Sequence, residues 1–447
     1  MPVLFRHRTA HRGPCSPLAA PVLAALLLAA LVGCTSKAPR PTPLPEPPDT
    51  TPAPPVVAPA PPLPSAEALR PTGRGRWVRS DWAELPGWSQ DALEPAWGAL
   101  LRSCERQLRW VIGNSGNSNS GNGGPAGGGA LSIGPAASQT FPPAQVAASW
   151  APTCRAAIAL GGGADERQIR DFLQTRLQPW RVESAQGQGE GLLTGYFEPL
   201  LEASRQRSER FGVALHAPPA DLAQRRPWYS RAQIDSLGAA QAALAGREIA
   251  WVADPMEALL LHIQGSGRLA ITEPNGARRV VRIAYAGHND QPYQSVGRWL
   301  VDQGAFTLEQ ASWPAIRAWA RANPQRVREM LAVNPRYVFF REEPLPDPGI
   351  GALGAQGVPL TPGRSIAVDR ESIPYGTPVW LASTEPQPWQ PNPPPARPMQ
   401  RLVVAQDTGS AIVGAVRADL FWGWGEGIED RAGRTKQPLR LWVLWPR

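Results

Sequence analysis

Three aspartates in the last third of the chain have neighbours that could equip a carboxyl group for chemistry. Asp369 precedes a Pro-Tyr-Gly-Thr turn, Asp407 stands between an apolar stretch and a glycine turn, and Asp419 is followed by Phe421 and Trp422. Apolar neighbours raise the pKa of a carboxyl group because burial disfavours its charged form, and a general acid near neutral pH needs such a raised pKa. Asp419 is therefore a candidate general acid, although a single aspartate is more often a turn former or a helix cap.

Other reactive residue types form no recognisable site in the sequence. The chain has five histidines: His7, His11, His216, His262 and His288. Their positions do not have metal-ligand spacing, and no cysteine–histidine cluster suits zinc. The segment Gln264-Gly265-Ser266-Gly267 lacks the first glycine of the Gly-x-Ser-x-Gly elbow of serine hydrolases. We therefore expect neither a metal nor a cofactor, and no serine hydrolase.

The formal net charge is +8, which by itself suits a nucleic acid, a membrane surface or an anionic polymer as partner. Only Lys37 and Lys436 are lysines, and the arginines are scattered along the chain. A groove for single-stranded nucleic acid would need basic residues interleaved with aromatic ones, and no such run appears. The charge is more simply a compositional habit of the genome, so we expect no nucleic-acid partner.

The first 34 residues have the pattern of a lipoprotein signal peptide. Arginines precede an apolar run of residues 17–32, which is long enough for a signal core and short for a membrane span. The run ends in Leu31-Val32-Gly33-Cys34, which resembles the lipobox of bacterial lipoproteins, and non-acidic Thr35 favours outer-membrane sorting. We expect lipidation at Cys34 and a periplasmic face of the outer membrane; the alternative is a plain secretory signal.

Residues 35–74 are proline-rich and predict a semi-rigid tether in the polyproline II conformation. Of the remaining cysteines, Cys15 leaves with the signal peptide. Cys104 and Cys154 then form a plausible disulfide in an oxidising compartment. That bond would bracket a low-complexity loop of glycine, asparagine and serine at 113–129.

Hydrophobic periodicity and cap residues predict the elements of the mature chain. Asp254-Pro255-Met256-Glu257 is typical of a helix start, and Met256, Leu259, Leu260 and Ile263 then give one apolar face. The last third, with short strands between glycine and proline turns, favours a small barrel. The expected helices are 92–111, 144–160, 166–177 and two pieces of 312–332 split by Pro324; the expected strands are 191–200, 269–272, 279–286, 366–368, 378–381, 401–405 and 440–444; a proline-rich loop covers 383–400.

Several segments together resemble a known family. The segments around Asp369, Asp407 and Asp419 are similar to the 3D domain, which is named for three aspartates. The upstream segments are Thr194-Gly195-Tyr196-Phe197-Glu198-Pro199, Gln264-Gly265-Ser266-Gly267, Tyr285-Ala286-Gly287, 292–298 and 334–340. They resemble signatures of the membrane-bound lytic murein transglycosylase A family, occur in the family's order, and cover roughly 190–447.

The resemblance implies a mainly β fold with flanking helices. A large domain built around a double-psi β-barrel would carry an inserted smaller β-barrel domain, with a groove for glycan between them. On this sequence the large domain would comprise residues 75–199 and 346–447, the second part being the 3D domain, and the insert would comprise 200–345. The loops 113–129 and 383–400 depart from the family pattern as additions.

The resemblance also implies an activity, namely cleavage of the bond between N-acetylmuramic acid and N-acetylglucosamine in peptidoglycan with a 1,6-anhydro product. Asp419 would be the single acid/base, Asp407 would shape its electrostatics, and Asp369 would be structural or would orient substrate. The residues expected to line the groove are Thr194, Gly195, Tyr196, Gln264, Gly265, Ser266 and Gly267. The partners would be glycan strands and, through Cys34, a membrane.

Two other functions stay open on the sequence. A muramidase-type hydrolase on the same scaffold would use Asp419 as acid and Asp407 as a base that activates water. A non-catalytic lipoprotein that binds peptidoglycan would need neither carboxylate.

Overall fold

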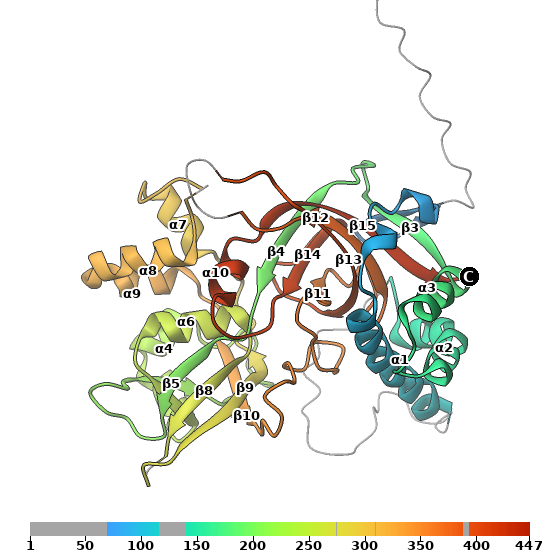
Figure 1. Ribbon diagram of the computed structural model, residues 1–447. Helices are drawn as coiled ribbons and strands as arrows, with labels where there is room; N and C mark the ends of the chain where they lie inside the picture. Colours follow the sequence, from blue (N-terminus) through green and yellow to red (C-terminus); the bar gives the residue numbers. More distant parts are fainter. Residues whose placement is uncertain (1–68, 116–139, 274, 309, 388–392) are drawn as a thin grey trace, which may run out of the picture. The chain divides into compact units, whose positions relative to one another are not determined.

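The computed structural model describes residues 69–115, 140–273, 275–308, 310–387 and 393–447 (Figure 1). The signal peptide, the lipidation site Cys34, most of the tether and residues 116–129 of the low-complexity loop lie outside the described residues. Within the part that is described, no helix is both long and apolar enough to span a membrane.

A nine-stranded sheet contains strands from both ends of the described chain (Figure 1). Its strands, in spatial order, are β1 (Leu69–Pro71), β2 (Gly75–Arg79), β3 (Leu177–Ser184), β15 (Lys436–Pro446), β12 (Pro378–Thr384), β13 (Pro398–Asp407), β11 (Ser365–Val368), β14 (Arg417–Phe421) and β4 (Gly191–Tyr196).

Strand β15 closes six of these strands into a ring. Its first residues, Lys436–Leu439, pair with β4, and residues further along pair with β12. The ladder β15-β12-β13-β11-β14-β4 therefore returns to β15. Two neighbouring pairs in it are parallel, β11 with β13 and β4 with β14. The ring and the helices beside it confirm the expected mainly β fold with a barrel.

A second sheet of six strands is formed by the middle of the chain. Its order is β10 (Val338–Glu343), β9 (Arg278–His288), β8 (Gly267–Thr272), β5 (Leu200–Ser204), β7 (Glu248–Val252) and β6 (Val213–His216). Buried residues from all six strands form one hydrophobic cluster with Ala258 and Leu261. The chain thus leaves the first sheet after β4 and returns to it after β10.

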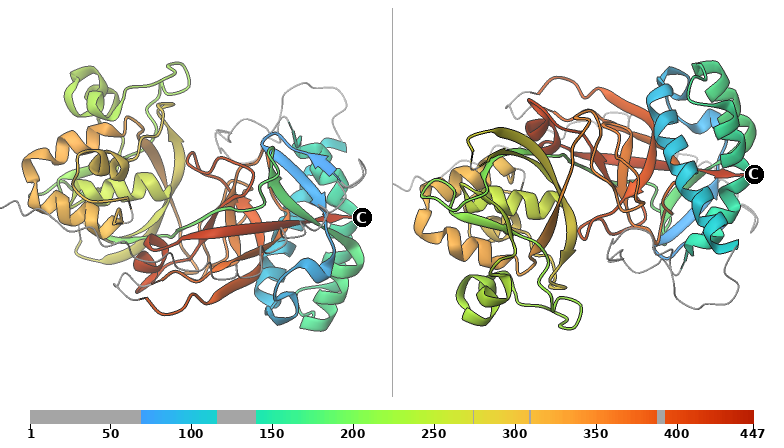
Figure 2. Two further views of the ribbon diagram at one scale, coloured as in Figure 1. Left: turned by 90° about the horizontal axis from the view of Figure 1, so that it is seen from above. Right: turned by 90° about the horizontal axis from the view of Figure 1, so that it is seen from below.

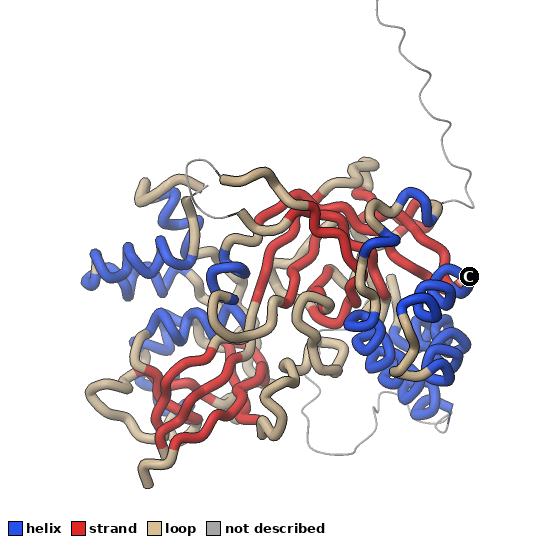
Figure 3. The backbone as a smooth tube through the Cα atoms, viewed as in Figure 1, coloured by secondary structure: helices blue, strands red, loops and turns tan. Residues whose placement is uncertain are grey.

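Helices lie beside both sheets (Figures 2 and 3). The helices are α1 (Glu94–Ser115), α2 (Pro143–Leu160), α3 (Glu166–Arg176), α4 (Arg231–Ser236), α5 (Gly238–Leu244), α6 (Pro255–Gln264), α7 (Val296–Asp302), α8 (Trp313–Ala322), α9 (Val327–Val333) and α10 (Ile428–Gly433), with short 3-10 helices at Trp82–Glu84, Trp88–Gln90 and Pro324–Arg326. Residues of α1, α2 and α3 share one hydrophobic core with the nine-stranded sheet.

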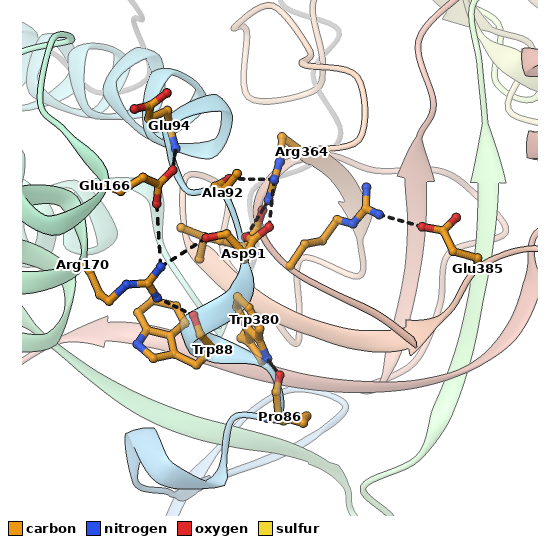
Figure 4. A network of polar contacts seen from close by, with 12 residues as sticks. Pro86, Trp88, Asp91, Ala92, Glu94, Glu166, Arg170, Arg364, Trp380 and Glu385 are labelled. Atoms are coloured by element: carbon orange, nitrogen blue, oxygen red, sulfur yellow. Dashed lines mark hydrogen bonds and ion pairs between the residues drawn. The ribbon is translucent and has the colours of Figure 1, made fainter. Parts of the chain in front are cut away.

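A polar network fixes the segment before α1 against the barrel (Figure 4). Arg364 forms a bidentate ion pair with Asp91, at 2.7 and 2.9 Å. Arg170 of α3 donates to the carbonyl of Asp91 at 3.2 Å, and Trp380 of β12 donates to the carbonyl of Pro86 at 3.1 Å. The segment is therefore held from the barrel and from a helix at once.

Helix α6 begins as the sequence predicts. Asp254 is the N-cap and accepts a hydrogen bond from the backbone of Met256 at 2.8 Å, and proline occupies the first turn. Met256 and Leu259 are buried, whereas Ile263, expected on the same face, is 39% exposed. Leu261 and His262 in the final turn are buried, so Ile263 lies on the exposed side of that turn.

Other boundaries differ from the sequence prediction because proline is compatible with strand ends and edges. Leu69–Pro71, assigned to the tether, is an edge strand paired with β2. The proline-rich loop expected at 383–400 is shorter, because β12 runs to Thr384 and β13 begins at Pro398. The strand expected at 191–200 is two strands, β4 and β5, in different sheets.

Candidate active site

Asp419 lies on β14, directly opposite Thr194 of the parallel strand β4. The Thr194 hydroxyl donates to Asp419 Oδ1 at 2.7 Å, and Arg417 Nη2 donates to the same hydroxyl at 2.8 Å. A threonine hydroxyl has a single proton, so Thr194 accepts a hydrogen bond from Arg417 and donates its own hydrogen bond to Asp419. The contacts therefore run in one direction, from Arg417 through Thr194 to Oδ1 of Asp419.

The pKa of Asp419 is raised to about 6, mainly by burial. The hydrogen bond from Thr194 and the charge of Arg417 lower this pKa, and the charge of Asp407 raises it. The residue is nevertheless partly exposed. Asp419 thus keeps its proton to a higher pH than an ordinary aspartate and can be reached from solvent, and both properties suit a general acid.

Asp407 lies near Asp419, on the other side of strand β11. Ala367 of β11 pairs with Asp407 on one edge and with Asp419 on the other. Asp407 Oδ2 accepts from the Tyr196 hydroxyl at 2.8 Å, and Oδ1 accepts from the backbone N–H of Ala355 at 2.9 Å. Burial raises the pKa of Asp407 despite these bonds. Both of its oxygens are therefore engaged by the protein.

The Tyr196 side chain stays protonated under all ordinary conditions. Burial raises its pKa well above the usual value, and the charge of Asp407 adds to that shift. Its ring also packs against Phe421, with centroids 5.2 Å apart. Tyr196 therefore acts as a fixed donor to Asp407.

Asp369 has a different environment from the other two aspartates. Its carboxylate is buried and pairs with Arg74 at 3.1 Å. It also accepts from the backbone N–H groups of Gly414 at 2.9 Å and Glu371 at 3.0 Å. These contacts fit the structural role considered from the sequence. A role in binding substrate stays a prediction.

Gly195, between Thr194 and Tyr196, leaves room for a tryptophan. A Cβ atom built on Gly195 would lie 2.6 Å from Trp422 Nε1 and 2.8 Å from Thr435 Oγ1. Trp422 Nε1 donates to that hydroxyl at 2.8 Å. Glycine at this position is therefore required for the close packing of β4 on the Trp422 indole.

The Gln264-Gly265-Ser266-Gly267 segment is the turn between α6 and β8. Gln264 Oε1 accepts from the backbone N–H of Phe197 at 3.0 Å, just after β4. Gly265 ends α6 in the left-handed conformation, and a Cβ on Gly267 would lie 2.3 Å from the Leu261 side chain. Ser266 is partly exposed. The turn is thus tied to the strand of Thr194, and its contact with glycan stays a prediction.

Two further features bear on the predicted residues. The structure joins Cys104 and Cys154 by a disulfide, which links α1 to α2. Within the described residues, no group of three or more His, Cys, Asp or Glu side chains could hold a metal ion.

Sequence reasoning missed Arg417 as part of the site. Because side chains alternate along a strand, residues two apart lie on the same face. Arg417 can therefore be recognised from the sequence only if the segment of Asp419 is predicted to be a strand.

Comparison with known proteins places the chain in a family. The family model of the MltA specific insert domain matches residues 192–341, and that of the 3D domain matches residues 364–445. The membrane-bound lytic murein transglycosylase A of Escherichia coli K12 is 32% identical over 287 residues, 64% of this chain and 73% of that protein. Its counterpart from Vibrio cholerae is 31% identical over 278 residues, 61% of this chain and 70% of that protein.

Solved structures give the same result. The lytic transglycosylase LtgG of Burkholderia pseudomallei is 40% identical, with a TM-score of 0.50, over 84% of this chain and 97% of that one. MltA from Neisseria gonorrhoeae is 28% identical, with a TM-score of 0.61, over 85% and 94%. E. coli MltA with bound chitohexaose is 25% identical, with a TM-score of 0.56, over 85% and 94%. The sequence matches, the shared fold and the ordered motifs agree, and the chain belongs to the membrane-bound lytic murein transglycosylase A family.

Proposed function

We propose that this protein is a peptidoglycan lytic transglycosylase in which Asp419 is the single acid/base. It cleaves the β-1,4 bond between N-acetylmuramic acid and N-acetylglucosamine and leaves a 1,6-anhydro-N-acetylmuramic acid end. The observation that carries the assignment is a partly exposed carboxyl group with a pKa of about 6 and one oxygen held by Thr194. Relatives named lytic murein transglycosylase, one of them crystallised with chitohexaose, support the substrate class.

In the first step Asp419 acts as the acid. Oδ1 accepts from Thr194, so the transferable proton of the carboxyl group is on Oδ2. That proton goes to the glycosidic oxygen, and the bond from this oxygen to C1 of the muramic acid breaks. An oxocarbenium-like centre forms at C1. After this transfer Asp419 is a carboxylate. The hydrogen bond from Thr194 and the charge of Arg417 stabilise it, since both lower the pKa of Asp419.

In the second step the same carboxylate acts as the base. It takes the proton from the C6 hydroxyl of the muramic acid, and the C6 oxygen attacks C1 to close the 1,6-anhydro ring. The nucleophile belongs to the substrate, so no water is consumed, and Asp419 ends the cycle protonated. One carboxyl group is therefore enough for both proton transfers.

The alternative of a water-using muramidase needs a second carboxylate as base. Asp407 is the residue considered for that role. Its two oxygens already accept from Tyr196 and Ala355. In the proposed reaction Asp407 instead keeps the pKa of Asp419 high through its negative charge.

The proposal is tested by digesting purified peptidoglycan with the wild-type chain and with Asp419→Asn, and analysing the products by mass spectrometry. The wild type is expected to release 1,6-anhydro ends, and the variant to be slower by about 10²–10⁴-fold, the usual contribution of a general acid. Asp369→Asn serves as a control aspartate and should keep the anhydro product. Reducing ends from the wild type would mean that water is the nucleophile and would sink the proposed reaction.

We also propose that Cys34 is lipidated and anchors the protein to the periplasmic face of the outer membrane. The lipobox-like Leu31-Val32-Gly33-Cys34 and the name "membrane-bound" carried by relatives support this. The wild type should fractionate with outer membranes, and Cys34→Ser should lose both the lipid mass and the membrane association. Retention of the variant in the membrane fraction would contradict the anchor.

A further inference from the structure

The carboxylate of Glu198 is buried between two arginines at the point where the chain crosses from one sheet to the other. Glu198 Oε2 accepts from Arg268 Nε at 2.9 Å, and Oε1 accepts from Arg282 Nε at 2.6 Å. The Glu198 side chain is 0% exposed and each arginine 6%. Glu198 stands between β4 and β5, and the arginines belong to β8 and β9. We call these three residues the Arg–Glu–Arg clamp.

The clamp holds both crossings between the sheets. The outgoing crossing, residues 197–199, contains Glu198 itself, and the backbone N–H of Arg268 donates to the carbonyl of Pro199 at 2.7 Å. On the returning crossing, residues 344–350, Arg268 donates to the carbonyls of Pro348 at 2.7 Å and Ile350 at 3.2 Å. Arg282 donates to Ile350 as well. One carboxylate thus organises the two chain segments that connect the sheets.

The clamp also reaches the end of the strand that carries Asp419. The backbone N–H of Glu198 donates to the carbonyl of Gly423 at 2.8 Å. The guanidinium of Arg268 lies over the ring of Trp424, 3.9 Å from its centroid. Gly423 and Trp424 come two and three residues after the end of β14, so a shift of the clamp would be transmitted to that strand.

An open pocket lies beside the crossings, although Phe197 of the outgoing crossing is buried in the core of the nine-stranded sheet. A cavity of about 470 Å³ is lined by Glu198, Pro199, Pro348, Trp313 and Trp424, among others. A close-packed core fixes the position of its elements through its contacts, and a cavity removes those contacts on one side. On the side of the pocket, the polar contacts of the clamp therefore contribute to how the crossings lie.

The two arginines and one glutamate of the clamp suit a role in positioning the crossings better than a role in stability alone. Desolvating buried ion clusters is expensive, and well-packed apolar residues in their place are often as stable. What a buried, hydrogen-bonded carboxylate supplies here is one defined arrangement, because its two oxygens and the two planar guanidinium groups satisfy each other in a single geometry.

We propose that Glu198 is a positioning residue for glycan cleavage, which fixes the six-stranded sheet and the Gln264–Gly267 turn relative to Asp419 on β14. The inference rests on the proposed function. Glycan held on the six-stranded side is presented to the acid only when the two sides are in register. Misplacement of reacting groups by about 1 Å can lower a rate about 10²-fold.

The test compares Glu198→Gln with a matched control in the full chain. The amide of Gln has nearly the size of the carboxylate but turns a donor towards one arginine. We expect kcat on purified peptidoglycan to fall about 10²-fold, with KM nearly unchanged and the same pH limb for the remaining activity. The control is Glu183→Gln, because Glu183 is also buried and binds two arginines, Arg76 at 2.9 Å and Arg181 at 2.7 Å, but lies on β3, away from the crossings. This control should keep its kcat.

A second measurement is independent of activity. In hydrogen–deuterium exchange, peptides covering 197–199 and 344–350 should exchange faster in Glu198→Gln and not in Glu183→Gln. Arg282→Lys, which keeps the charge but cannot bind Glu198 and Ile350 together, should show the same effect if Glu198→Gln does not fold. Unchanged exchange at the crossings, or an equal loss of kcat in the control, would overturn the inference. A wild type without anhydro product would instead overturn the proposed function, and the exchange data would still decide on the clamp.

Discussion

At the scale of single residues, the acidity of Asp419 is set by opposing influences. Burial and the charge of Asp407 raise its pKa, while Thr194 and Arg417 lower it. In the proposed reaction, the first pair favours the protonated form needed for the acid step, and the second favours the carboxylate needed for the base step. A group with both supports can serve as acid and then as base without leaving the working pH range.

Some neighbours of Asp419 lower its pKa and others raise it, so replacing one of each should move the basic limb of the pH profile in opposite directions. A general acid must be protonated, so kcat/KM falls as pH rises through the pKa of Asp419. Thr194→Val removes a hydrogen bond that lowers this pKa, and the basic limb should move to higher pH. Asp407→Asn removes a charge that raises it, and the limb should move to lower pH. Steady-state kinetics across pH 4–9 check both shifts, and movement in the same direction would contradict the assignment.

Asp419 should also lower the stability of the protein at neutral pH. Its folded pKa of about 6 lies above the ordinary aspartate value of 3.8, so the folded state binds the proton more tightly than the unfolded chain. The associated stability is complete below about pH 4 and is lost as pH rises through about 6. Asp419→Asn, which can still accept from Thr194, should therefore be more stable than wild type at pH 8, by roughly 1–3 kcal/mol. Thermal unfolding at pH 4 and pH 8 tests this, since the gain should vanish at pH 4.

Only part of the residue-scale picture could be read from the sequence. Aromatic neighbours singled out Asp419, and the structure gives it the expected raised pKa. The separate environment of Asp369 could not be foreseen, because its partner Arg74 is 295 residues away. Catalytic roles for Asp419 and Asp407 remain predictions until the variants are measured.

At the scale of elements, helices were easier to predict than strand pairing. The Asp254 cap and the proline after it mark the start of α6 locally. The pairing of β4 with β14 is parallel and joins segments far apart in the chain, and nothing local specifies its register. Strand β3 was missed because it is buried on both faces, so it has no alternating pattern.

The close packing beside the β4–β14 pair makes Gly195 sensitive to one added methyl group. In Gly195→Ala the Cβ would meet the Trp422 indole at 2.6 Å, so the strand or the indole must move. We expect a loss of about 1–3 kcal/mol in unfolding free energy and a fall in kcat, since Thr194 is the next residue. Gly433→Ala is the matched control, because a Cβ at Gly433 has nothing within 4 Å. Equal behaviour of the two variants in thermal melts and kinetics would refute the packing argument.

At the scale of the whole molecule, the Cys104–Cys154 disulfide stabilises the helical layer of the barrel. It closes a loop of 50 residues between α1 and α2, and such a cross-link restricts the unfolded chain. Replacing both cysteines by serine should lower the unfolding free energy by about 2–4 kcal/mol, with kcat unchanged because neither residue contacts Asp419. Denaturant unfolding with and without reductant measures the effect. Reductant should affect only the wild type.

The arrangement of the two sheets was implied by the family resemblance and not by hydrophobic patterns. Those patterns found most strands of the last third, but they did not show that β4 belongs with them. To place β4 in the sheet of the last third, one must know that the chain returns to this sheet after β10, and only the structure shows this. The boundaries 75–199, 200–345 and 346–447 stay a prediction.

The distance along the chain between Thr194 and Asp419, 225 residues, has a consequence for biosynthesis. Synthesis proceeds from the N-terminus, so β4 exists long before its parallel partner β14 is made. The whole six-stranded sheet is added in the interval, and β15, which closes the ring, comes last. A chain that stops before β14 therefore lacks the contact between Thr194 and Asp419. An enzyme whose substrate is the cell's own wall therefore lacks this pairing until β14 has been synthesised.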